Sequence, residues 1–159
     1  MKRWIVPVLA AAVVAVMVPV VALAASSGTT SSQVNRQLGV WRNSPISTTS
    51  TSFQALSGLG AKICSTGEVS VTVSLDGTGA PMGLRVLVNY GATMGPGAIR
   101  FAPQGAADTT SFTFVQNTQP FEANDNHYFD LEWRSPFGGK TTLLEATMNL
   151  VYQQGTHAC

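Results

Sequence analysis

The stretch that decides the fold class is HYFDLEWR, residues 127–134 of a 159-residue chain. Its apolar side chains Phe129, Leu131 and Trp133 alternate with charged ones, and a period of two places the two sets on opposite faces of an extended strand. The charged face carries Asp130, Glu132 and Arg134. One apolar face and one charged face predict a half-buried β-strand. Trp133 is expected near the centre of the core, because large aromatic side chains bury the most apolar surface.

The chain repeats this alternation in short segments from Phe53 onward. They are, in order, a weak segment at residues 52–56, then residues 69–75, 84–90, 99–101, 112–114 and 144–152. Turn signals separate them, and no long helical period follows the N-terminal segment. The pattern predicts an all-β fold, an immunoglobulin-like antiparallel β-sandwich of about seven strands. This likeness is one of architecture only, because the Cys…Trp…Cys core spacing of immunoglobulin domains is missing, so it implies no function.

The N-terminus predicts a secretory signal peptide over residues 1–24. Lys2 and Arg3 precede an apolar run, residues 5–21, and Ala22-Leu23-Ala24 supplies the small-x-small cleavage pattern. The alternative is a retained membrane anchor, since an apolar run of about 20 residues is long enough to span a bilayer.

Residues 25–50 are expected to form a flexible Ser/Thr-rich leader, and residues 51–159 the β-sandwich domain. A segment so rich in Ser and Thr buries too little apolar surface to offset the entropy lost on ordering. Residues 38–41, Leu-Gly-Val-Trp, are apolar and are expected to dock on the domain, with docking on a partner as the alternative.

The charge balance narrows the classes of partner. Loss of Lys2 and Arg3 with the signal leaves seven basic residues of nine against eight acidic ones, so the formal balance moves from +1 to −1. This gives no overall attraction to nucleic acid or to anionic membranes. We expect no nucleic-acid partner, and a membrane contact only through an uncleaved signal segment. We expect the protein to be secreted or held at the cell surface. Its partner could be an extracellular protein or a glycan, and its oligomeric state is left open.

Cys64 and Cys159 are the two cysteines of the chain. An even count in an exported protein predicts a disulfide bond between them. Two free thiols in redox or metal chemistry are a weaker alternative, since no CxxC pair exists, and intermolecular pairing through Cys159 is another.

Motifs that would mark an enzyme are missing from the sequence. There is no Gly-rich phosphate loop, HExxH, GxSxG or complete EF-hand loop, so we assign no catalytic residue and expect no cofactor. His127 lies on the apolar parity of its strand and is expected to be structural. The alternative is a catalytic base oriented by Asp125, for which no nucleophile can be named.

One segment carries weak candidates for a calcium site. They are the oxygen-bearing residues Glu122, Asn124, Asp125 and Asn126. Calcium prefers such ligands, and we expect them in one loop before the strand at residues 127–134. Their spacing lacks the glycine and the distal Glu of a known calcium loop, and Asx residues are also ordinary turn formers.

These observations favour a non-enzymatic binding module that acts through its loops. The candidate loops are residues 89–97, 103–109 and 135–140, and Phe137 is the candidate contact at a loop tip. One alternative is a structural or self-assembling envelope or extracellular component that joins through unpaired edge strands. A second is a small secreted hydrolase.

A hairpin is expected between residues 127–134 and residues 144–152, because consecutive strands usually neighbour each other. The register that avoids pairing Glu132 with Glu145 places Trp133 opposite Ala146. It also places Leu131 opposite Met148 and Phe129 opposite Leu150.

Overall fold

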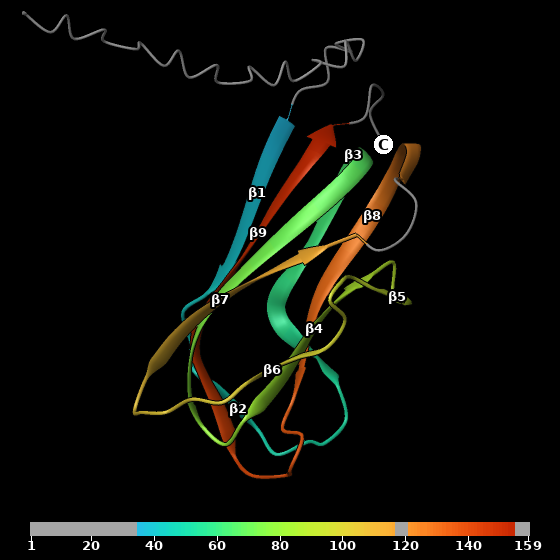
Figure 1. Ribbon diagram of the computed structural model, residues 1–159. Coiled ribbons are helices and arrows are strands. Elements are labelled where there is room, and N and C mark those ends of the chain that lie inside the picture. Colours follow the sequence, from blue (N-terminus) through green and yellow to red (C-terminus); the bar gives the residue numbers. More distant parts are fainter. Residues whose placement is uncertain (1–34, 117–120, 155–159) are drawn as a thin grey trace, which may run out of the picture. The chain divides into compact units, whose positions relative to one another are not determined.

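The computed structural model describes residues 35–116 and 121–154 of the chain (Figure 1). These residues form nine β-strands and no helix: β1 (Asn35–Arg42), β2 (Ile46–Thr48), β3 (Gln54–Gly79), β4 (Met82–Val88), β5 (Ala92–Thr93), β6 (Ile99–Phe101), β7 (Asp108–Val115), β8 (Phe121–Arg134) and β9 (Thr141–Gln154). Over this part of the chain there is accordingly no apolar helix of membrane-spanning length. The predicted all-β fold is confirmed.

The longest strand, β3, reverses direction near its middle. Gln54 at its start lies opposite Trp133, and Gly79 at its end lies opposite Thr141. Trp133 and Thr141 are eight residues apart in the sequence, so at most about 28 Å separates them in space. If residues 54–79 formed one straight strand, its two ends would be roughly 80 Å apart. The ends of β3 are therefore too close together for a straight strand. The chain turns where the register shifts near Gly67, whose φ is +79°. β3 therefore serves both layers of the sandwich (teal and green in Figure 1).

Two antiparallel sheets pack together as a β-sandwich. We call one the β9 sheet; it runs β7, second half of β3, β9 and β1, with β2 beside the start of β9. The other, the β8 sheet, runs first half of β3, β8 and β4, with the short strands β5 and β6 on β4.

The core lies between the sheets and includes the apolar face of β8. Phe129 and Leu131 are fully buried and Trp133 is 1% exposed. The β9 sheet contributes alternate residues of its two central strands, which are Val69, Val71, Val73, Met148 and Leu150. The residues that the alternation in HYFDLEWR placed inside are thus inside, and its charged residues face outward.

Residues 35–48 do not belong to a flexible leader, as the sequence suggested, but to the sandwich. β1 pairs along its whole length with β9, from Asn35 opposite Gln153 to Arg42 opposite Ala146. Leu38 and Val40 pack against the core. The pairing of β1 with β9 and the burial of Leu38 and Val40 offset the entropy that is lost when this segment becomes ordered. The Ser/Thr-rich residues around it bury too little apolar surface to do so on their own.

The predicted hairpin between β8 and β9 is wrong, since these strands lie in different sheets. Trp133 lies opposite Gln54 and Leu84, not Ala146. Ala146 lies opposite Arg42 and Leu75. The connection over residues 135–140 crosses from one layer to the other, because each strand has both of its edges occupied by other neighbours.

The predicted disulfide stays a prediction, because Cys159 lies outside the described residues. Cys64 is half-buried in β3, and its neighbour Ser65 lies opposite Gln154, the last residue of β9. Cys159 is five positions beyond Gln154 in the sequence, a reach of at most about 18 Å. The described part of the chain thus ends close to Cys64.

Candidate functional site

The outer face of the β9 sheet is covered by small hydroxyl side chains. Strands β3 and β7 send Val71, Val73 and Phe114 inward, so the alternate residues of both strands face outward. Thr72 meets Thr113 across the pair with 3.2 Å between hydroxyl oxygens, and Ser74 meets Ser111 with 3.0 Å. A face of this kind offers many hydrogen-bonding groups.

A cleft of about 260 Å³ crosses this face from β1 to β7. The residues that give it its chemistry are Trp41, Asn43, Ser74, Asp76, Glu145 and Thr147. Trp41 is 71% exposed, so most of its indole is available to a ligand. The cleft combines a broad apolar surface with groups that donate and accept hydrogen bonds.

Sheet register brings these residues together from distant parts of the sequence. Trp41 of β1 lies opposite Thr147 of β9, which in turn lies opposite Ser74 of β3. One step further along the strands on the same face, Asp76 lies opposite Glu145 on one side and Thr109 on the other.

Asp76 and Glu145 make the cleft acidic. Like charges directly opposite each other on a sheet are destabilising. Among the side chains that the structure describes, neither carboxylate forms a salt bridge; the ion pair found there joins Arg85 to Glu132 on the other sheet. Arg42 also lines the cleft, but its guanidinium donates to the carbonyl oxygens of Ser44 and Ser57, at 2.8 and 2.9 Å.

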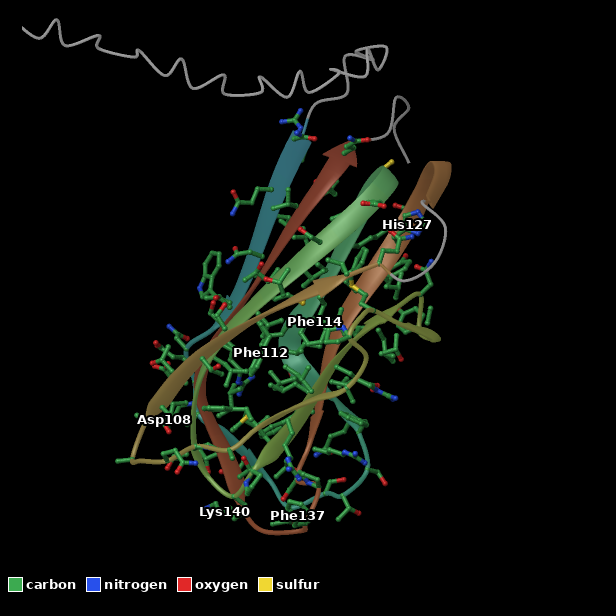
Figure 2. All side chains as sticks on the ribbon, viewed as in Figure 1. Asp108, Phe112, Phe114, His127, Phe137 and Lys140 are labelled. Carbon is green, nitrogen blue, oxygen red and sulfur yellow. The ribbon has the colours of Figure 1, made fainter. Side chains whose placement is uncertain are left out.

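Phe137, the loop contact suggested by the sequence, lies in the connection between β8 and β9 and does not line the cleft. Its side chain is 68% exposed, and the guanidinium of Arg100 lies 5.5 Å from the ring centroid. Figure 2 places Phe137 and His127 toward opposite ends of the sandwich. Phe137 is thus a separate exposed aromatic surface.

His127 is 5% exposed and belongs to a buried polar contact. Its Nδ1 lies 3.2 Å from the side-chain nitrogen of Asn89, and the Asn89 side-chain oxygen accepts from the backbone N–H of Tyr128 at 2.9 Å. Asn89 and Tyr90 have φ of 50° and 61°, and Gly91 N–H donates back to Val88 across this tight turn. These hydrogen bonds hold the turn after β4 against β8. They give His127 a structural role in the fold.

The calcium candidates do not form a loop, because β8 already begins at Phe121. Their segment pairs as strand backbone, with Asn126 opposite Cys64 and Asp125 opposite Ser65. The side chains of Glu122, Asn124 and Asp125 lie outside the described part of the structure, and that of Asn126 is exposed. Among described side chains, no group of three His, Cys, Asp or Glu residues is close enough to share a metal ion.

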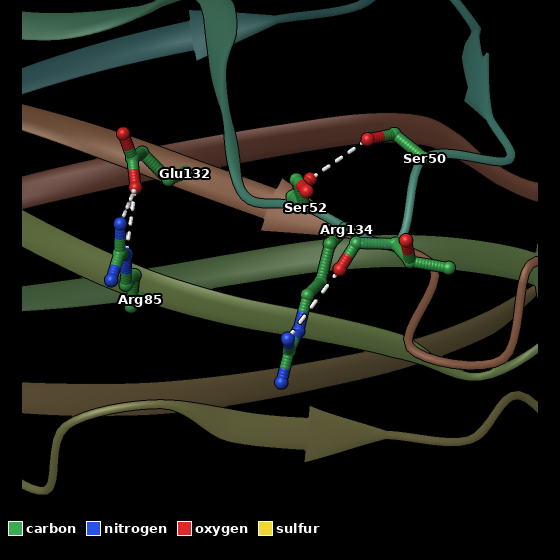
Figure 3. A network of polar contacts seen from close by, with 6 residues as sticks. Ser50, Ser52, Arg85, Glu132 and Arg134 are labelled. Atoms are coloured by element: carbon green, nitrogen blue, oxygen red, sulfur yellow. Dashed lines mark hydrogen bonds and ion pairs between the residues drawn. The ribbon is translucent and has the colours of Figure 1, made fainter.

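The charged face of β8 is braced by its neighbours (Figure 3). Arg85 binds Glu132 at 2.6 Å, and the guanidinium groups of Arg85 and Arg134 lie 4.3 and 4.4 Å from the ring centroid of Phe53. Burial raises the pKa of Asp130 above its ordinary value, and the nearby charge of Glu132 adds to the rise. Contacts within the sandwich account for this cluster.

No protein-family model matches the chain, and no curated protein matches its sequence at a significant level.

Proposed function

We propose that this protein is an exported, non-enzymatic binding module that holds its ligand on the outer face of the β9 sheet. The observation that carries the proposal is the cleft beside Trp41. Core packing does not account for the position of Trp41, since Leu38 and Val40 supply the contacts of β1 to the core. Exposed tryptophan next to hydrogen-bonding groups is typical of contact sites, where aromatic side chains contribute much of the binding free energy.

Export rests on the N-terminal pattern and on the cysteines. Lys2, Arg3 and the apolar run before Ala24 fit a signal peptide. A disulfide between Cys64 and Cys159 would suit the oxidising compartment that such a signal leads to. We also propose an immunoglobulin-like architecture, which the two packed antiparallel sheets support. Architecture alone carries no function.

The binding face is tested by presenting the mature chain, residues 25–159, to arrays of glycans and of synthetic peptides. We expect at least one class of probe to bind the wild-type protein and to lose binding on Trp41→Ala. Phe137→Ala is the matched control, because it removes an equally exposed aromatic side chain outside the cleft. Binding that is lost on Phe137→Ala but kept on Trp41→Ala would move the site to the loop.

Self-assembly is a second candidate, favoured by the position of β1. This strand is eight residues long, contains no proline and pairs on one side only among the described strands. An open edge of this kind accepts another strand. Light scattering during size-exclusion chromatography over a range of protein concentrations would reveal such association.

A further inference from the structure

We propose that the Trp41 cleft binds a neutral oligosaccharide. This inference rests on the proposed binding function and specifies its ligand class. The argument has three parts: the apolar surface of the indole, the hydrogen-bonding groups beside it, and the sign of the charge.

The indole of Trp41 offers a flat apolar surface at the edge of the sheet. Its exposed fraction of 71% leaves room for a second ring on it. A pyranose ring has a face made of C–H groups, which is apolar and slightly positive. Such a face suits the electron-rich face of an indole.

The floor of the cleft carries the groups that sugar hydroxyls need. The carboxylate oxygens of Asp76 and Glu145 accept hydrogen bonds, while the hydroxyls of Ser74 and Thr147 both donate and accept. Hydroxyl groups that donate to a carboxylate make charge-assisted bonds, which are stronger than neutral ones. Thr147 and Ser74 follow Trp41 in one row across the sheet, so a ligand stacked on the indole meets these groups in order.

Charge complementarity decides against acidic ligands. Asp76 and Glu145 lie opposite each other, and no described side chain forms a salt bridge with either. The Arg42 guanidinium, which also lines the cleft, is engaged with two backbone carbonyl oxygens and does not neutralise this pair. An acidic glycan would add a third negative group, whereas a neutral sugar presents uncharged hydroxyls that can donate to both carboxylates. A cationic peptide would also satisfy the carboxylates, and it is the competing ligand in the test.

The dimensions also fit a sugar chain. The cleft crosses four strands, a width of about 14 Å at the usual strand spacing. The cleft has a volume of about 260 Å³ and is open to solvent along one side, so it is a shallow trough and not an enclosed cavity. An open trough of this length takes an extended chain of sugar rings and not an enclosed compact ligand.

The test is titration of the mature chain with cellohexaose, xylohexaose, mannohexaose and maltohexaose. Intrinsic fluorescence is the first readout, because the mature chain holds only Trp41 and the buried Trp133. Isothermal titration calorimetry is the second. We expect saturable binding of at least one hexaose, with affinity reduced at least about tenfold by Trp41→Ala. Asp76→Asn and Glu145→Gln should each reduce it several-fold.

Two controls keep the result specific to the cleft. Glu68→Gln removes an exposed carboxylate of β3 that does not line the cleft, and Phe137→Ala removes an exposed aromatic outside it. Both are expected to leave the affinity unchanged. Circular dichroism and melting temperature establish that each variant is folded.

Three outcomes would overturn the inference. Binding of a Lys/Arg-rich peptide that depends on Trp41, with no binding of any hexaose, would leave the binding module standing and remove the sugar. Binding of a hyaluronan hexasaccharide as tight as that of the neutral sugars would refute the charge argument. If neither sugars nor peptides bind in a way that depends on Trp41, both the ligand class and the proposed function fail.

Discussion

Two tryptophans of the same chain occupy opposite environments. Trp133 is 1% exposed and Trp41 is 71% exposed. The first follows from its place in a strict alternation of apolar and charged residues. The exposure of Trp41 does not follow from such a pattern, because Leu-Gly-Val-Trp at residues 38–41 has apolar side chains at both odd and even positions. Individual residues were therefore predictable where a clear period of two surrounds them and unpredictable where it does not.

Trp133→Ala is expected to lower the free energy of unfolding by about 3–5 kcal/mol, the usual cost of truncating a large buried aromatic side chain. Phe137→Ala should cost much less, because its ring is 68% exposed. Urea denaturation of both variants measures the contrast. Equal losses would mean that the Phe137 ring packs on the sandwich.

Asp130→Asn tests the pKa of a carboxyl group on the outer face of β8. Burial raises this pKa in the folded protein above its ordinary value of 3.8, so the folded state holds the proton more tightly than the unfolded state. Ionisation of Asp130 therefore costs stability, and the cost appears as the pH rises from the ordinary pKa through the raised one. Asparagine cannot ionise and avoids this cost.

We expect the melting temperature of Asp130→Asn, relative to wild type, to become more favourable between about pH 3 and pH 7. Differential scanning calorimetry across this range gives the comparison. A difference that stays constant with pH would argue that Asp130 has no raised pKa.

At the scale of elements, alternation identified the strands but not their partners. The strand signals at residues 69–75 and in HYFDLEWR were correct, whereas the β8–β9 hairpin was wrong. Strand pairing depends on which edges other strands occupy, and Trp133 already lies between Gln54 and Leu84. The reversal of direction inside β3 was not predicted either, although Gly67 is a turn-forming residue and has a positive φ.

Asn89→Ala is expected to lower stability by about 2–3 kcal/mol. Alanine pays a penalty of roughly 1 kcal/mol or more at positive φ, and each lost hydrogen bond adds about 1 kcal/mol. Asn89→Asp should cost less, because aspartate tolerates this backbone conformation and keeps the oxygen that accepts from Tyr128. Thermal denaturation of the pair is the measurement. An Asn89→Ala variant as stable as wild type would show that the turn is held by other contacts.

At the scale of the whole molecule, the predicted bond between Cys64 and Cys159 would close a loop of about 95 residues and stabilise the fold by roughly 4–5 kcal/mol on the chain-entropy model. Dithiothreitol should lower the melting temperature of the wild-type protein and leave a Cys64→Ala/Cys159→Ala double variant unchanged. Thiol titration of the unreduced exported protein provides the check. Two reactive thiols per chain would contradict the bond.

The fold class was predictable from local pattern, but the candidate site was not. Ser74 and Thr147 face outward by simple alternation, as their strands suggest. Their meeting with Trp41 depends on the antiparallel register of β1, β9 and β3, which brings Trp41 together with residues 33 and 106 positions away in the sequence. The strand register cannot be read from the sequence alone, and the binding surface was therefore predicted on the loops and not on the sheet.

Chemical-shift mapping by NMR tests the central claim, that the ligand binds on the outer face of the β9 sheet, most directly. The mature chain would be titrated with the hexaose that binds most tightly, and the two indole N–H signals assigned with Trp41→Phe. We predict that the Trp41 indole signal and the backbone signals of Ser74 and Thr147 shift together, while the Trp133 signal stays in place. Shifts confined to residues 89–97 or 135–140, with the Trp41 signal unmoved, would contradict it.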